Sequence, residues 1–338
     1  MGSVSPLIAI YEEIKTQKPN AEFLWLATKD GSEEVLIESY NIPIKKIFAG
    51  KLRRYFSWKN FLDPFLIAFG FCQSFFTILS YKPQVVISAG GFVAVPVIWA
   101  AWILRRPSLI HQQDMRPGLA NKLAAPFANV ITVTFEKSLA DFSAKKTVLV
   151  GNPVRADLLL GSKEEGYKIF NLDSNLPTIL IIGGGTGAYN LNKLVLKSLG
   201  ELVQFCQVIH LTGGRIDQEV DHSRYRSFEF LTDQLKHAYA VADLVVSRAG
   251  MAVLSELSAL AKPAILIPIS NSHQEENAVE FFRNNAAALL KEPDLSPADF
   301  SLAIKELLFD QAELNNLSRN INKIMPKDVA SRIVKIIL

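Results

Sequence analysis

The sequence contains little cysteine and has almost balanced charge. Cys72 and Cys206 are the two cysteines among 338 residues, and they lie far apart, which argues against a disulfide framework and a cysteine-based zinc site. The formal net charge of +3 is too small to indicate nucleic-acid binding. No charged segment precedes an apolar one at the N-terminus, so we expect no secretion signal and a protein that stays in the reducing cytoplasm.

The sequence also lacks the common nucleotide and metal motifs. G-x-x-x-x-G-K-[ST] is absent, which argues against a P-loop. The segment 183–188 fits the dinucleotide fingerprint only with Ala in its last position, and no strand ending in a carboxylate follows at the required distance. No D-x-D carboxylate pair stands in a cleft-like context. We therefore expect no NAD, no ATP, no metal and no other cofactor.

A long unbroken apolar run is absent as well. Residues 61–79 are rich in Phe, but Asp63, Pro64, Gln73 and Ser74 interrupt them, so the run falls short of the roughly 20 apolar residues that span a bilayer. The basic segment 51–59 precedes it. A basic cluster beside an aromatic helix is suited to the headgroup layer of an anionic membrane. A core helix after a solvated basic loop is an equally good interpretation.

The remaining pattern is an alternation of apolar strands and helices. With 338 residues, 49% of them hydrophobic, the chain is long enough for two domains with sizeable cores. The alternation predicts α/β domains with parallel sheets, each doubly wound. We expect an N-terminal domain over 1–152, joined by a C-terminal helix at 326–338, and a second domain over 153–325. The expected strands are 22–27, 85–88, 108–111, 130–133, 147–150, 178–182, 208–211, 227–230, 244–247 and 264–267.

Glycine turns follow several of these strands. They occur at 88–91, 183–187 and 212–214. Glycine permits positive φ and lets a ligand approach the backbone closely, and crevices at the C-terminal ends of parallel strands are the usual ligand sites. For each turn alone, a tight connection without a ligand is the commoner explanation. Together they predict a cleft.

Residues 243–278 give the strongest functional indication. A buried strand runs into Arg248-Ala249-Gly250 and a helix that carries Glu256. The N-terminus of such a helix favours phosphate, Glu256 is placed to accept both ribose hydroxyls, and Gln274 with Asn277 could bind a sugar ring. The segment predicts a nucleotide-sugar site. For Arg248, an ion pair within the domain is an open alternative to ligand contact.

These residues occur in an order that resembles the MurG family. The resemblance covers essentially the whole chain, and its order and spacing are more specific than any single loop. It implies a GT-B fold, in which two Rossmann-like domains face a cleft. The matching segments are 6–9, 88–91, 111–114, 117–122, 151–155, 183–188, 248–250, 255–256, 273–274 and 277–278.

The resemblance also implies the site residues. It places a donor-binding set mainly in the second domain, with a phosphate loop for the acceptor in the first. The acceptor loop comprises Gly90, Gly91 and Asn121. The donor set comprises Gly2, Arg155, Gly185, Thr186, Thr232, Arg248, Met251, Ala252, Val253, Leu254, Ser255, Glu256 and Gln274.

The activity that the resemblance implies is an inverting hexosyltransferase reaction. N-acetylglucosamine would pass from UDP-N-acetylglucosamine to the 4-OH of an undecaprenyl-diphosphate-linked N-acetylmuramoyl peptide, a step of peptidoglycan synthesis and hence of cell-wall biogenesis, cell shape and cell division. The location implied is peripheral, at the cytoplasmic face of the bacterial inner membrane, on an anionic lipid surface. Two alternatives stay open: another GT-B enzyme such as a UDP-sugar epimerase, or a UDP-sugar-binding protein with impaired catalysis.

The chain departs from the family at its start. The usual first apolar strand and G-G-T-G-G-H loop are missing, and Ser3 stands at the position of the loop histidine. A serine hydroxyl is a poor base, whereas an imidazole titrates near neutrality. His111 and Asp114 therefore become candidates for the acid/base role, although His111 is more typical of a structural histidine. We expect Met1 to be an internal methionine of a longer protein, and the loss of a central strand to leave sheet edges exposed. Gly185 and Val253 replace the usual Ser and Thr.

Overall fold

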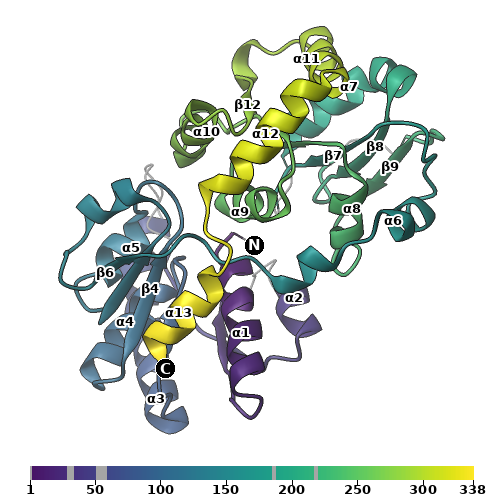
Figure 1. Ribbon diagram of the computed structural model, residues 1–338. Coiled ribbons are helices and arrows are strands. Elements are labelled where there is room, and N and C mark those ends of the chain that lie inside the picture. Colours follow the sequence, from purple (N-terminus) through teal and green to yellow (C-terminus); the bar gives the residue numbers. More distant parts are fainter. Residues whose placement is uncertain (1, 29–33, 51–58, 185–187, 217–219) are drawn as a thin grey trace. The chain divides into compact units, whose positions relative to one another are not determined.

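The computed structural model describes residues 2–28, 34–50, 59–184, 188–216 and 220–338 (Figure 1). Contacts divide the chain into two units. The N-terminal unit contains residues 3–153 and 328–338, and the C-terminal unit contains residues 154–327 with residues 1–2. The predicted α/β class is confirmed, because both units contain parallel sheets with helical connections.

The larger sheet of the N-terminal unit has four parallel strands in the order β3-β4-β5-β6. Strand β4 is buried throughout, although Ser108, His111 and Gln112 are polar, as expected for a central strand of a parallel sheet between helices, whereas the edge strand β6 is largely exposed. Helices α3 and α4 pack together over one core cluster, which includes Ile98, Ile110 and Ile131. The elements are α3 (Lys59–Tyr81), β3 (Val86–Ser88), α4 (Ala94–Ile103), β4 (Ser108–Gln112), α5 (Leu119–Ala124), β5 (Val130–Val133), η1 (Glu136–Asp141) and β6 (Thr147–Leu149).

A second, smaller sheet lies in the same unit. Strands β1 (Trp25–Ala27) and β2 (Ile44–Lys46) pair in parallel, with α2 (Glu34–Ser39) between them in the chain. Among the residues described, β1 pairs with β2 alone and β3 with β4 alone. The parallel sheet is thus interrupted between β1 and β3, and each of these strands is an edge.

Helix α1 (Ser5–Gln17) connects the parts of the N-terminal unit. Its Ile10 and Ile14 pack with Leu109 of β4 and with α13 (Val329–Ile337). Its Ile8 packs instead with Ile37 of α2. Figure 1 shows α13, in yellow, beside α1, in purple. The C-terminal helix therefore belongs to the N-terminal unit by its packing.

The C-terminal unit contains a six-stranded parallel sheet in the order β12-β11-β10-β7-β8-β9. From β7 the chain proceeds outward through β8 and β9, and then returns to the other side of β7 with β10, β11 and β12. The direction of winding reverses between β7 and β10, and such a switch point leaves a crevice beyond the strand ends. The strands are β7 (Thr178–Ile182), β8 (Gln207–Leu211), β9 (Tyr225–Phe228), β10 (Leu244–Ser247), β11 (Ala264–Leu266) and β12 (Ala288–Leu289).

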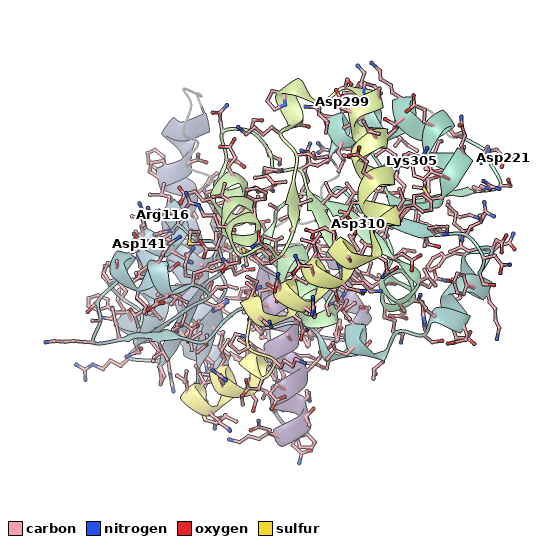
Figure 2. All side chains as sticks on the ribbon, turned by 45° about the horizontal axis from the view of Figure 1, so that its top comes forward. Arg116, Asp141, Asp221, Asp299, Lys305 and Asp310 are labelled. Carbon is pink, nitrogen blue, oxygen red and sulfur yellow. The ribbon has the colours of Figure 1, made fainter. Side chains whose placement is uncertain are left out.

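The helices of the C-terminal unit cover this sheet. The amphipathic α7 and α11 pack against each other and share the core cluster that contains Val195 and Ile304. Helix α12 begins where the carboxylate of its N-cap, Asp310, accepts the N–H of Glu313 at 2.9 Å. Helix α11 begins where the Ser296 hydroxyl accepts the N–H of Asp299 at 3.1 Å, and Figure 2 labels Asp299 and Asp310. The helices are η2 (Ala156–Leu160), α6 (Lys163–Ile169), α7 (Tyr189–Phe205), α8 (Leu235–Val241), α9 (Met251–Leu260), α10 (His273–Arg283), η3 (Glu292–Asp294), α11 (Pro297–Phe309) and α12 (Gln311–Ile324).

The strand predictions need four corrections. The strand expected at 22–27 begins at Trp25, where its pairing with β2 starts. The strand expected at 227–230 lies at Tyr225–Phe228, because Arg226 turns its guanidinium onto the Phe170 and Asn171 carbonyls and remains in the ladder. Strands β2 and β12 were not predicted. The first has two exposed lysines in three residues and the second has only two residues, so neither shows an apolar strand pattern.

Helix α3 is longer than the apolar run suggested. It has 23 residues, and within it Asp63–Tyr81 has a mean hydropathy of 1.4 with 22% of the window buried. In the part of the chain that the structure describes, it is the one helix long and apolar enough to cross a membrane by length and composition. A single helix of this kind is weak evidence for a span. The basic segment 51–58 that precedes it lies outside the described residues.

Candidate functional site

The switch point of the C-terminal unit is bounded by the turns after β7 and β10. These strands are neighbours, with Ile182 opposite Ser247, so their turns leave the same edge of the sheet. Gly184 has φ +90°, a conformation that favours glycine. Gly185 and Thr186 lie outside the described residues. The turn after β10 leads directly into α9.

The start of α9 has the properties of an anion site. Gly250 is its N-cap, with no side chain that caps the helix, and the first helical hydrogen bond joins the Leu254 N–H to the Gly250 carbonyl at 3.0 Å. The N–H groups of Met251, Ala252 and Val253 therefore have no partner within the helix, and the positive end of its dipole adds to them. A phosphate group fits this geometry.

Glu256 lies in the second turn of α9 and is only 6% exposed. Its Oε2 accepts a hydrogen bond of 2.7 Å from the Tyr239 hydroxyl of α8. Burial and then the charge of Glu256 raise the pKa of Tyr239 well above its usual value, so the phenol stays protonated and donates. Glu256 is therefore not a solvated glutamate on a helix surface. It is a buried carboxylate with a defined orientation.

Arg155 lies close to this pair. Its charge lowers the pKa of Tyr239, against the larger effect of burial, and its Nη1 lies 3.9 Å from Asp157 Oδ2. The Arg155 side chain is buried. We call Arg155, Tyr239 and Glu256 the buried polar cluster. Two of its three members belong to the donor set predicted from sequence.

The other predicted donor residues have varied surroundings. Arg248 donates from Nη1 to the Ile267 carbonyl at 3.0 Å and pairs through Nη2 with Glu292, which favours the ion-pair alternative left open by the sequence. Gln274, in the first turn of α10, accepts the Ile269 N–H at 3.2 Å. Asn277 donates to the Ala249 carbonyl at 3.2 Å and so ties α10 to the turn before α9.

Three predicted donor residues are exposed or have a hydrogen bond within their own segment. Thr232 is exposed and lies before α8, where its carbonyl accepts the Leu235 N–H. Gly2 is exposed, and a Cβ placed on it would meet no described atom within 4 Å. The Ser255 hydroxyl donates to the Met251 carbonyl at 2.6 Å and so faces its own helix. Their binding roles stay predictions.

The acceptor-side residues gather at the end of β3 in the N-terminal unit. Gly90 and Gly91 have φ +96° and +87°. A Cβ on Gly90 would lie 3.5 Å from Asn121 Oδ1, and one on Gly91 would lie 3.8 Å from Ser3 Oγ. Asn121 is held by its Nδ2, which donates to Gln112 Oε1 at 2.6 Å. The structure thus brings Ser3, Gly90, Gly91 and Asn121 together, and their role in ligand binding stays a prediction.

The two candidate acid/base residues differ in exposure. His111 is completely buried, with Nδ1 3.0 Å from Thr132 Oγ1 and Nε2 2.7 Å from Asn152 Oδ1. Burial lowers the pKa of His111 to about 4. Because both ring nitrogens are used inside the unit, the geometry favours the structural interpretation of His111. Asp114, on the loop after β4, is partly exposed.

Sequence reasoning missed Tyr239 and the link between His111 and Asn152. Tyr239 is 17 positions from Glu256 and Asn152 is 41 positions from His111. No spacing rule connects residues on different elements at such separations. Among the described residues, no group of three or more His, Cys, Asp or Glu side chains could hold a metal ion.

Comparison with known proteins identifies the family. The N-terminal domain of glycosyltransferase family 28 matches residues 1–133, and the C-terminal domain of the same family matches residues 178–333. The chain belongs to glycosyltransferase family 28. It is a glycosyltransferase, and the expected assignment to the transferase class is confirmed.

Individual relatives narrow the family and confirm the resemblance to MurG. The chain is 39% identical over 305 residues to the UDP-N-acetylglucosamine--N-acetylmuramyl-(pentapeptide) pyrophosphoryl-undecaprenol N-acetylglucosamine transferase of Clostridium tetani, which covers 88% of this chain and 85% of the relative. The crystal structure of Acinetobacter baumannii MurG matches with a TM-score of 0.71 at 23% identity, over 99% of this chain and 96% of that one. A UDP-N-acetylglucosamine 2-epimerase matches with a TM-score of 0.69 at 14% identity, over 99% of this chain and 93% of that one. The last two likenesses establish the fold, which is GT-B as predicted.

Proposed function

We propose that this family 28 glycosyltransferase transfers N-acetylglucosamine from UDP-N-acetylglucosamine to the 4-OH of a lipid-linked N-acetylmuramoyl-pentapeptide. The observation that carries the proposal is the 39% identity to a transferase named for this reaction, over most of both chains. The product would be the lipid-linked disaccharide precursor of peptidoglycan. The chain would thereby support cell-wall synthesis, and through it cell shape and division.

The geometry of the C-terminal unit supports the donor half of this proposal. The N-terminus of α9 offers N–H groups for the diphosphate, and the buried Glu256 carboxylate suits two vicinal ribose hydroxyls as acceptor. Arg155 supplies a cationic fork for phosphate oxygens. Gln274 and Thr232 would contact the sugar and the uracil.

The reaction we propose is a direct displacement with inversion. The acceptor oxygen forms a bond to the anomeric carbon as the bond from that carbon to the diphosphate breaks, and UDP leaves with the electron pair. Positioning and stabilisation of the charge on the diphosphate would supply most of the rate enhancement. The proton of the acceptor hydroxyl needs a base, and Asp114 is the candidate carboxylate with partial exposure. We propose no metal or other cofactor.

The proposed location is the cytoplasmic face of the bacterial inner membrane, bound peripherally. One side of α3 exposes Phe65, Phe69 and Phe76, each about two thirds exposed, at 65%, 64% and 67%. The opposite side packs into the core through Phe71, Phe75 and Ile78. A helix buried along one side and apolar along the other suits a membrane surface better than a span.

A cavity with two lysines in its lining lies beside this face. It has a volume of about 560 Å³ and is lined by Lys45, Lys46, Gln73, Phe76, Thr77, Leu79 and Ser80. Lys46 pairs with Glu34 at 2.8 Å, so Lys45 supplies the positive charge beside the exposed Phe76 ring, and such a combination suits anionic lipid surfaces. The cavity therefore supports an anionic membrane as partner. We propose no nucleic-acid partner.

The epimerase alternative rests on the fold alone, since that match has 14% identity. Parallel incubations and a donor-binding measurement separate the three functions. Purified protein is mixed with UDP-N-acetylglucosamine labelled in the sugar, with and without a short-chain lipid-diphosphate acceptor, and a Glu256→Gln variant is the control. Labelled disaccharide supports the transferase, a 2-epimerised UDP-sugar formed without acceptor supports the epimerase, and donor binding without either product supports a binding protein.

A further inference from the structure

The Tyr239 hydroxyl forms a hydrogen bond with the residue proposed to bind the ribose. The hydroxyl donates to Glu256 Oε2 at 2.7 Å from a different helix. Tyr239 is completely buried, so it is not placed to touch the nucleotide itself. A hydrogen bond to a charged oxygen in a buried position is stronger than one between neutral groups.

We propose that Tyr239 is a positioning residue, which fixes the Glu256 carboxylate in the orientation that receives the ribose hydroxyls of the donor. The inference rests on the proposed function and deepens it. A glutamate side chain has three rotatable bonds, and the last of them has a broad energy profile. A hydrogen bond to one carboxylate oxygen fixes that rotation and therefore the direction of the other oxygen. Binding then loses less conformational entropy.

The surroundings of Tyr239 support this role. The Tyr239 ring, on α8, is completely buried in the core of the unit, so the position of its hydroxyl is fixed by the surrounding packing. Arg155 lies near enough for its charge to act on Tyr239. The phenol thus contacts the residue proposed for the ribose and lies within electrostatic reach of the one proposed for the diphosphate. Rigid support of this kind is what keeps a binding group in its productive geometry.

A purely structural hydrogen bond is the competing explanation, and the two differ in which ligands are affected. If Tyr239 only stabilises the packing of α8 on α9, its loss weakens every nucleotide equally. If it positions Glu256, its loss weakens only ligands that carry ribose hydroxyls. UDP and 2′,3′-dideoxy-UDP differ in those hydroxyls alone, so they separate the explanations.

The test is calorimetric titration of the full chain and its Tyr239→Phe variant with both nucleotides. Because the hydrogen bond is already present without ligand, only the cost of ordering the Glu256 side chain enters the affinity, so we expect UDP affinity to fall about three- to tenfold. We expect the affinity for 2′,3′-dideoxy-UDP to change by less than about threefold, since the ribose contact is already gone. In turnover assays, KM for UDP-N-acetylglucosamine should rise while kcat changes little.

Tyr225→Phe is the matched control. Tyr225 is also buried in the C-terminal unit, and its hydroxyl lies 2.8 Å from His210 Nδ1. This variant loses a similar hydrogen bond without touching Glu256, so its ratio of UDP to dideoxy-UDP affinity should equal that of the unchanged chain. Should Tyr239→Phe fail to fold, p-aminophenylalanine at position 239 keeps a donor and should preserve the ratio.

An equal loss for both nucleotides, or no loss for either, overturns the positioning role. Glu256→Gln distinguishes this from failure of the proposed function. If Glu256→Gln weakens UDP binding and Tyr239→Phe does not, the donor site stands and the inference about Tyr239 fails. If the unchanged chain binds both nucleotides equally and Glu256→Gln has no effect, the donor site itself is wrong.

Discussion

Replacing the three exposed phenylalanines of α3 tests whether this helix binds a membrane surface. Phe65, Phe69 and Phe76 are each about two thirds exposed, at 65%, 64% and 67%. Since a Phe side chain has about 200 Å² of surface, each leaves about 130 Å² in water, equivalent to about 3 kcal/mol on complete burial. If about half of this area enters the lipid, the three rings contribute about 4–5 kcal/mol, or roughly a thousandfold in the partition coefficient.

The assay is flotation with vesicles of phosphatidylglycerol and phosphatidylcholine. We expect the unchanged chain to float with anionic vesicles, less so at high salt because screening weakens the attraction of the lysines, and the triple Phe→Ser variant to stay at the bottom. Phe282→Ser is the matched control, since Phe282 is 52% exposed on α10 of the C-terminal unit. Phe75 is unsuitable, because it packs into the core. Equal flotation of the triple variant and the unchanged chain would refute the membrane role of α3.

Three further predictions concern the N-terminal unit and the buried histidines. Burial lowers the pKa of His111 and His210 to about 4 each. Between about pH 6.5 and pH 4 the unfolded state therefore binds more protons than the folded state, and each histidine should lower the free energy of unfolding by up to about 3 kcal/mol over that range. Urea unfolding at pH 7 and pH 5 measures this loss, and pH-independent stability would contradict it. Gly91→Ala should destabilise the unit by about 1–2 kcal/mol, because Gly91 has φ +87° and L-residues are strained there; Gly118→Ala, where φ is −68°, is the control, and equal losses would contradict the reasoning. Fusing an apolar strand and a glycine turn before Ser3 should slow hydrogen exchange at β1 and β3, since both are sheet edges; unchanged exchange there would show that the gap does not accept a strand.

Much of the fold followed from local pattern, because parallel strands buried on both faces are apolar along their whole length. Strands such as β7 and β10 were found for this reason. Strand β2 was missed because Lys45 and Lys46 obscure it. The period of an α-helix places Phe65 and Phe69 on one side of α3 and Phe71 and Phe75 on the opposite side. A count of aromatic residues alone does not show this difference.

The candidate site was predictable only in its local part. Glu256 follows a glycine turn at a fixed distance, so the sequence indicates it directly. The hydrogen bond from Tyr239 depends on how α8 lies relative to α9, and no local sequence pattern indicates this arrangement. For His111 the sequence left two alternatives, and only its partners Thr132 and Asn152 distinguish them.

The interruption between β1 and β3 has a consequence for cooperativity. Among the described residues, the two sheets of the N-terminal unit share no hydrogen-bonded ladder, so side-chain packing links them, through α1 and through Leu26 and Ile47, which pack into the core of the four-stranded sheet. Segments joined by packing without a shared ladder can open separately. The β1-α2-β2 portion should therefore form its own unfolding unit, which opens at lower free energy than the four-stranded sheet and exposes the apolar side of α1 as it does so.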